Sequence, residues 1–171
     1  MNPSRRPSST LPPPPPGVDV TIESDPANIA AVRRAVEDLG RTAGLDERAV
    51  ADLGLCVNEA LANVIRHAYG GAAGRPIQIR AHWRDDALVV TIRDWGNGVN
   101  PASLPPKPYD PLEPGGLGLI CLQKLLTEVA YVPQDNGMLL VMTQRRKSQS
   151  RPPHRPHGGD GGRNAPERGN E

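Results

Sequence analysis

The positions of proline restrict where this chain forms helices and strands. The sequence has 171 residues and 20 prolines, of which seven lie in residues 1–17, six in residues 99–114 and four in residues 148–171. Proline has no backbone N–H group and a fixed φ angle, so such segments do not form the interior of a helix or a sheet. Regular structure is therefore expected in residues 18–147, with an interruption at residues 99–114.

These boundaries divide the chain into one domain and two tails. Residues 18–147, about 130 in all, are enough to bury a core without disulfides or a structural metal. The run of proline at residues 12–16 favours an extended N-terminal tail over residues 1–17, with a ligand for an SH3-type domain as the alternative. Residues 148–171 are rich in glycine, proline and arginine and have no large apolar side chain, so both tails are expected to be disordered.

Composition excludes several classes of partner and location. The chain has 20 basic and 19 acidic residues, a net charge of +1, so no overall field attracts it to nucleic acid or to an anionic membrane. It has neither a signal-peptide pattern nor an apolar run of about 18 residues, which predicts a cytoplasmic protein without a membrane span. Cys56 and Cys121 lie in apolar stretches without metal-binding spacing and are expected to be reduced thiols in a core.

The domain is expected to begin with a strand and a helix. Residues 18–22 alternate between apolar and polar side chains, as a half-buried strand does. A helix is expected to start near Ser24-Asp25-Pro26 and to end at Gly40 and Gly44. Apolar residues recur within it every three or four positions, at Ile29, Val32, Val36 and Leu39.

A second helix, two strands, a third helix and two more strands are expected to follow. Asp46 is expected to cap the second helix, which continues to about Tyr69 and ends at Gly70-Gly71. Alternation and turn residues then predict strands at 77–83 and 87–92 around a turn at 84–86, a helix at 116–127, and strands at 128–133 and 138–144. The last two strands are joined by Gln134-Asp135-Asn136-Gly137, which contains the Asn-Gly pair typical of hairpins.

The loop at residues 99–114 interrupts this second set of elements. A loop of that length inside a compact domain is typically functional, so we expect it to be a lid. The order strand, helix, helix, strand, strand, lid, helix, strand, strand predicts an α+β fold. The expected architecture is a two-layer sandwich with helices on one face of a mixed, mostly antiparallel sheet.

The second predicted helix contains polar residues in an otherwise apolar stretch. Residues 53–65 read LGLCVNEALANVI, and Glu59 and Asn63 are four positions apart, so both project from one helix face. Burying a carboxylate costs several kcal/mol unless a partner or a metal meets it. Taken alone, such a pair is typical of a solvent-exposed stripe of the helix, and the motifs that follow favour a functional site instead.

Two glycine-containing motifs follow along the chain. Asp94 ends a predicted strand and is followed by Gly96 and Gly98 at DxGxG spacing, which lets a planar ligand approach the backbone, although a strand-ending turn uses the same residues. Residues 115–119 read GGLGL at a predicted helix start, where free backbone N–H groups favour phosphate. Each motif alone is weak evidence for a nucleotide site.

Together these motifs resemble a known set. ExxxN on a helix, DxGxG after a strand and GxGL at a helix start are similar to the motifs of the GHKL superfamily, whose ATP-binding fold is shared by gyrase, Hsp90-type chaperones, histidine kinases and MutL. The resemblance covers residues 18–146, and NEALANVIRHAYG is especially similar to the small anti-sigma-factor serine kinases of the RsbW type. The resemblance implies a Bergerat-type ATP-binding fold.

The resemblance also implies a role for each motif residue. Asn63 matches the magnesium ligand, and Glu59 matches the general base that activates the attacking hydroxyl or water. Asp94 matches the acid that binds the adenine amino group, in a pocket shaped by Gly96 and Gly98. The backbone that lies against the phosphates is matched by Gly116, Leu117 and Gly118. The implied cofactors are ATP and Mg²⁺.

One position departs from the family pattern. Members usually have Thr shortly after the glycine of the last hairpin, where it helps to hold adenine through water. Here Gly137 is followed by Met138 and Leu139. The adenine contacts are therefore expected to be fewer, and the nucleotide affinity lower, than in relatives.

The resemblance implies an ATP-binding anti-sigma factor, a protein-serine kinase that regulates transcription by partner switching. The implied partners are a sigma factor and an anti-anti-sigma protein of the STAS type, and a homodimer is left open. The length of 171 residues argues against the gyrase, Hsp90 and MutL types, which need further domains. His67 is interpreted as a packing or phosphate-side residue rather than a phosphoacceptor. The alternatives are a non-catalytic module that sequesters its partner with ATP as a structural ligand, and a stand-alone histidine-kinase-like ATPase domain.

Overall fold

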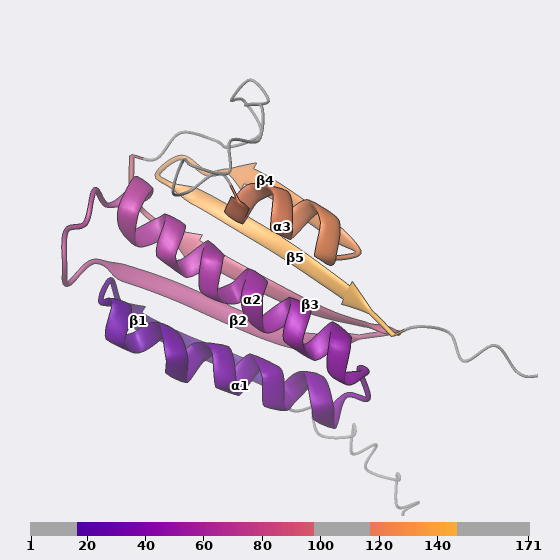
Figure 1. Ribbon diagram of the computed structural model, residues 1–171. Coiled ribbons are helices and arrows are strands. Elements are labelled where there is room, and N and C mark those ends of the chain that lie inside the picture. The colour runs from indigo at the N-terminus through magenta and orange to yellow at the C-terminus, as the bar shows by residue number, and fades with distance from the viewer. Residues whose placement is uncertain (1–16, 98–116, 147–171) are drawn as a thin grey trace, which may run out of the picture.

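The computed structural model describes residues 17–97 and 117–146, and within α3 the side chains from residue 121 onward. The strands are β1 Gly17–Glu23, β2 Pro76–Arg84, β3 Ala87–Asp94, β4 Glu128–Pro133 and β5 Met138–Arg145, and the α-helices are α1 Ile29–Thr42, α2 Glu47–Asn63 and α3 Leu117–Leu125 (Figure 1). A 3₁₀ turn at Pro26–Asn28 precedes α1, and a π-helical turn at Val64–Ala68 continues α2. The described elements follow the order that the sequence predicts.

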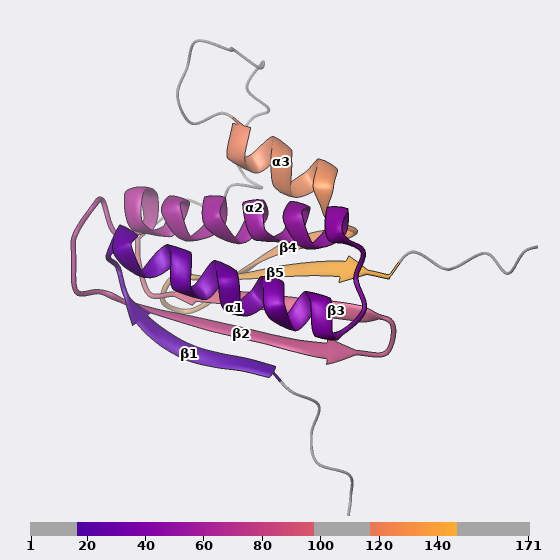
Figure 2. The ribbon, with the colours of Figure 1, turned by 60° about the horizontal axis from the view of Figure 1, so that its bottom comes forward.

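The five described strands form one sheet in the order β1-β2-β3-β5-β4. Each pairing between them is antiparallel, so the expected antiparallel character is confirmed and no parallel pair occurs within the described residues. The three helices lie on the same face of this sheet (Figure 2). The predicted α+β fold, a two-layer sandwich, is therefore confirmed.

The core fills the space between the sheet and the helices. Because side chains alternate along a strand, β2 and β3 each direct every second residue toward the helices, and Ile77, Ile79 and Leu88 are fully buried there. The four apolar positions predicted for α1 are all buried against them. The core is aliphatic, with Leu53, Leu61 and Met142 among its largest fully buried side chains.

The helical stretch formed by α2 and the π-helical turn begins and ends where the sequence predicts. The Asp46 side chain accepts a hydrogen bond from the Ala49 N–H group at 2.7 Å, which satisfies one of the free donors at the helix start. At the other end the π-helical turn closes with the Tyr69 N–H group bonded to the Val64 carbonyl. Gly70 follows with a φ angle of 59°, a conformation that favours glycine.

Two predicted helix boundaries are wrong. Gly40 does not end α1 but lies inside it, because the helix packs closely at this point: an added Cβ atom would lie 3.3 Å from Leu45. Only Gly44, with a φ angle of 81°, belongs to the helix end. The helix predicted to reach residue 127 ends at Leu125, since the Thr127 N–H group already bonds to the Thr143 carbonyl of the sheet at 3.0 Å.

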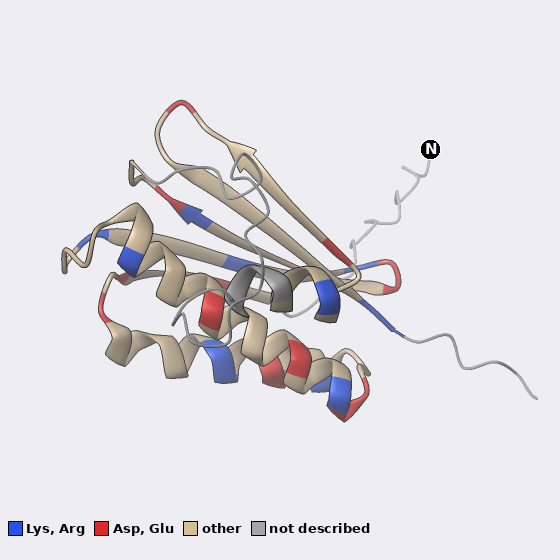
Figure 3. Ribbon diagram, turned by 45° about the horizontal axis from the view of Figure 1, so that its top comes forward, with Lys and Arg blue, Asp and Glu red and all other residues tan. Residues whose placement is uncertain are grey.

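Several predictions fall outside the described residues. The proposed lid at 99–114 and both predicted tails are among them, apart from Gly17 at the start of β1. None of the helices in the described ranges is long and apolar enough to cross a membrane. Basic and acidic residues are interspersed over the described helices and turns, without separation by sign (Figure 3).

The two cysteines are both free. Cys56 is fully buried in α2, and this burial raises the pKa of its thiol to about 12. A thiol in this environment stays protonated and is a poor nucleophile. The prediction of a reduced core thiol is therefore confirmed for Cys56, whereas Cys121 on α3 is only partly buried.

Candidate functional site

Asp94 lies at the end of β3, on the face of the sheet that the helices cover. It is only 5% exposed, and its Oδ1 atom accepts a hydrogen bond from the Gly96 N–H group at 2.9 Å. Burial raises the pKa of this carboxyl group, while the hydrogen bonds from Gly96 and Met138 and the charge of Arg93 act in the opposite direction. A carboxylate in this setting is a strong acceptor for a further N–H donor.

Gly96 brings the loop after β3 into close contact with the end of the π-helical turn. A Cβ atom at this position would lie 2.2 Å from the Ala68 carbonyl oxygen, so only glycine fits. The Asn97 N–H group donates to the same carbonyl at 3.2 Å. The close approach described at Gly96 is therefore to the protein's own backbone. The approach of a planar ligand, which the DxGxG motif predicts, stays a prediction.

Tyr69 holds the loop after β3 through its hydroxyl group. Its hydroxyl donates to the Pro76 carbonyl and accepts a hydrogen bond from the Trp95 N–H group, the latter at 2.9 Å. Burial raises the pKa of this phenol, so it stays protonated and keeps both bonds. The sequence predicted Tyr69 only as the end of the second helix and not as a residue of the site, although a tyrosine directly before Gly70-Gly71 was the available signal.

The β4–β5 hairpin closes the other side of Asp94. Gly137 has a φ angle of 87°, and a Cβ atom there would lie 2.1 Å from the Asp94 carbonyl oxygen. Met138 pairs with Asp94 in register, so one of the two residues that follow Gly137 in place of the expected threonine lies directly beside the acid. Arg93 donates to the Met138 carbonyl at 3.4 Å and its guanidinium lies over the Trp95 ring.

Glu59 and Asn63 lie one turn apart on α2, and both are partly buried. Arg66, from the π-helical turn, lies close to both of them. Its Nη2 atom is 3.4 Å from the Asn63 Oδ1 atom and 4.0 Å from the Glu59 Oε2 atom. The structure therefore joins the two predicted residues through a third, which the sequence analysis did not identify. His67, the next residue, is exposed.

The glycine-rich segment is only partly described. Leu117 and Gly118 form the first turn of α3, which packs beside α2 (Figure 1). Gly98 and Gly116 lie outside the described residues, so their predicted contacts with a nucleotide stay predictions. Within the described ranges, no three His, Cys, Asp or Glu side chains gather to hold a metal ion.

A small open hollow adjoins the contact between Gly96 and Ala68. It has a volume of about 200 Å³ and is lined by Ala68, Tyr69, Ala72, Arg75, Trp95, Gly96 and Asn97. The Arg75 guanidinium lies 5.6 Å from the centre of the Tyr69 ring, at the edge of this hollow. The hollow shares Gly96 with the predicted adenine pocket but includes neither Glu59 nor Asn63.

The chain is similar to several known proteins. The chain is 27% identical to the serine-protein kinase RsbW of Listeria innocua, over 74% of this chain and 85% of that one. It is 26% identical to the RsbW kinase of Bacillus subtilis, over 74% and 84%. The fold is similar to a crystal structure of the RsbU and RsbW domains of a Mycobacterium tuberculosis protein, with a TM-score of 0.58 and 19% identity, over 77% of this chain and 33% of that one.

These similarities confirm the resemblance to RsbW-type kinases that the motifs indicate. The chain also matches a model of a wider family. Residues 22–144 match the model of the histidine kinase-like ATPase domain. This range covers most of the described residues and includes every candidate site residue. The chain therefore belongs to the histidine kinase-like ATPase domain family.

Proposed function

We propose that this protein is an ATP-binding anti-sigma factor that phosphorylates a serine of an anti-anti-sigma protein of the STAS type. The observation that carries the proposal is the pair of Glu59 and Asn63, one turn apart on α2 in a chain whose relatives are named serine-protein kinases. Partner switching between this second protein and a sigma factor would then regulate transcription. The action is proposed to take place in the cytoplasm.

Asp94 is the proposed anchor for adenine. The carboxyl group is buried at the end of β3 and receives backbone donors, and the exocyclic amine of adenine is a donor of the same kind. Gly96 has no side chain to fill the proposed pocket, and its backbone packs directly against Ala68. Gly98 is proposed to extend this wall.

Asn63 is the proposed ligand for magnesium. The residues fit this ion, since its Oδ1 atom already faces a cation, the Arg66 guanidinium, and magnesium accepts a single amide oxygen together with phosphate oxygens and water. When bound, the ion would neutralise charge on the phosphates of ATP. The backbone around Gly116, Leu117 and Gly118, next to the start of α3, is proposed to hold those phosphates.

Glu59 is the proposed general base. Its carboxylate would accept the proton of the serine hydroxyl as that oxygen forms a bond to the γ-phosphorus atom, while the bond from phosphorus to the bridging oxygen breaks and ADP leaves. The side chain is about 30% exposed, so a partner protein has access to it. No other described acid of α2 lies one turn from Asn63.

Labelled ATP and purified candidate anti-anti-sigma proteins test the proposal. Wild-type protein should label one serine, and Glu59→Gln should reduce the labelling rate by about 10² or more, the usual contribution of a positioned base. ATP affinity, measured by calorimetry, should stay within a few fold. Glu47→Gln is the matched control, because Glu47 begins the same helix and its side chain is 80% exposed.

The outcome also decides between the proposed kinase and a sequestering module. If wild-type and Glu59→Gln proteins retain the sigma factor equally and neither labels a serine, the catalytic proposal is wrong. ATP would then be a structural ligand. If no nucleotide binds at millimolar concentration, the whole functional proposal fails although the fold is unchanged.

A further inference from the structure

Arg66 connects the two residues that the proposed reaction needs. A single nitrogen, Nη2, lies 3.4 Å from the Asn63 Oδ1 atom and 4.0 Å from the Glu59 Oε2 atom. The Arg66 side chain is 51% exposed, so its guanidinium is held by these contacts and not by burial. It therefore has room to take another position at small cost.

Ordinary helix geometry explains why the guanidinium reaches this place. Side chains on a helix lean toward its N-terminus, so Arg66 extends back over the turn that carries Asn63. The Arg66 Nε atom donates to the Ala62 carbonyl at 3.3 Å, which holds the inner end of the guanidinium. The Nη2 atom at its outer end then lies on the same side of the helix as Glu59.

This position conflicts with the proposed metal ligand. Magnesium binds oxygen at about 2.1 Å and needs near-octahedral geometry. A guanidinium nitrogen at 3.4 Å from the same amide oxygen would lie within the ion's coordination shell or next to it. Two cations so close repel each other strongly, so they exclude each other at Asn63.

We propose that Arg66 is a positioning residue that occupies the cation position at Asn63 and has to leave before magnesium binds there. This inference rests on the proposed nucleotide site. Departure of the guanidinium would also release the Glu59 carboxylate from its described cationic partner. The same movement would therefore complete the metal site and free the base for the serine proton.

The inference predicts how strongly magnesium and nucleotide binding are coupled. Without magnesium, Arg66 would supply positive charge near the phosphates and so would strengthen nucleotide binding. With magnesium, Arg66 would have to be displaced, which would weaken nucleotide binding. Both effects reduce the ratio of nucleotide affinity with magnesium to that without it, which we call the magnesium factor. Removing the guanidinium should therefore increase that factor.

Calorimetric titration with ADP, in EDTA and in saturating Mg²⁺, measures the factor directly. We expect it to be about fivefold larger in Arg66→Gln than in the wild type, the size of one exposed charge contact. Arg66→Lys keeps the charge but cannot span both residues, and should give an intermediate factor. Purely structural damage would weaken both titrations equally and leave the factor unchanged.

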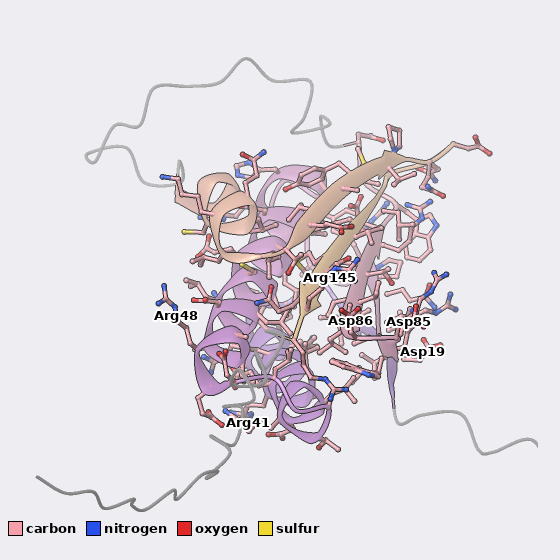
Figure 4. The ribbon with its side chains drawn as sticks, turned by 90° about the vertical axis from the view of Figure 1, so that its right-hand side faces the viewer. Asp19, Arg41, Arg48, Asp85, Asp86 and Arg145 are labelled. Atoms are coloured by element: carbon pink, nitrogen blue, oxygen red, sulfur yellow. The ribbon has the colours of Figure 1, made fainter. Side chains whose placement is uncertain are left out.

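Arg48→Gln is the matched control. Arg48 lies on the same helix, pairs with Asp52 at 3.8 Å and points into solvent, with its side chain 81% exposed (Figure 4). In Arg48→Gln, the ratio of ADP affinity with magnesium to that without it should equal that of the wild type. An unchanged factor in Arg66→Gln, with ADP still bound, would overturn the role of Arg66 and leave the proposed function intact. Absence of ADP binding in the wild type would overturn both.

Discussion

The two sides of the candidate site are built in different ways. Around Asp94 the chain meets itself backbone to backbone: Gly96 lies on the Ala68 carbonyl and Gly137 on the Asp94 carbonyl. Around Glu59 the contacts are between partly exposed side chains, joined through Arg66 at 3.4 to 4.0 Å. We refer to the first region as the Asp94 wall and to the second as the Glu59 edge.

The difference separates what has to stay fixed from what has to move. Backbone contacts without side chains leave no freedom, so the Asp94 wall is part of the folded core and presents one shape. Side-chain contacts at a half-exposed helix surface exchange at low cost, which suits the proposed binding of a metal and a protein substrate there. Substitutions of the wall glycines should therefore affect folding, and substitutions at the edge should affect chemistry.

Gly96→Ala should have the largest effect on stability. The new methyl group would lie 2.2 Å from the Ala68 carbonyl oxygen, and a backbone atom cannot move aside without shifting the π-helical turn. We expect the free energy of unfolding to fall by about 3 kcal/mol, as in other overpacked sites. Denaturant titration followed by circular dichroism measures this.

Gly54→Ala is the matched control for that substitution. A Cβ atom at Gly54 would lie 2.1 Å from an atom as well, but that atom is the Glu37 Oε1 atom at the end of a flexible side chain. The carboxylate can rotate away, and alanine favours the helix interior by up to about 1 kcal/mol. Equal losses at Gly54 and Gly96 would contradict the rigid wall.

Asp94→Asn should weaken nucleotide binding by about 1 to 3 kcal/mol. The substitution replaces a buried charge-assisted acceptor by an amide that presents a donor to the adenine amine. Calorimetry with ADP tests this, and the fold should be retained because the Gly96 N–H group still finds an oxygen at 2.9 Å. Unchanged affinity would place adenine elsewhere.

Most of the fold could be predicted because its signals are local. Alternating side chains located the strands, and the Asp46 cap and the Gly70-Gly71 pair located the ends of the long helix. Gly40 misled the prediction, because glycine marks a helix end and a close packing contact equally well. Only the position of Leu45 after folding decides between the two.

The site was predictable in its residue types and not in its connections. Glu59, Asn63 and Asp94 are recognisable since polar residues in apolar surroundings are rare. The sequence did not predict the roles of Tyr69 and Arg66, because these roles depend on contacts that form on folding. Tyr69 accepts a hydrogen bond from Trp95, 26 residues further along the chain, and Arg66 acts only through the side chains that it contacts.

Acid should reveal the burial of Asp94. Its pKa in the folded protein is raised above the ordinary 3.8, so its favourable contribution to stability is complete below pH 3.8 and is lost as pH rises through the raised value. Asp94→Asn cannot titrate, so its stability relative to the wild type should be highest near neutral pH and should fall as pH decreases toward 4. A constant difference between the two proteins over this range would contradict a buried, titrating acid.

Glu59→Gln should have the smallest effect on folding. The carboxylate contributes one contact, at 4.0 Å to an arginine that is half exposed, and such pairs add little to stability because solvent screens them. We expect the free energy of unfolding to change by less than about 0.5 kcal/mol, the range of ordinary surface substitutions. Thermal and denaturant unfolding of Glu59→Gln and Gly96→Ala compare the loss of unfolding free energy at the Glu59 edge with that at the Asp94 wall. A loss at Glu59 as large as the loss at Gly96 would make this acid part of the framework, and the side chain would then lack the freedom that a base meeting a protein substrate requires.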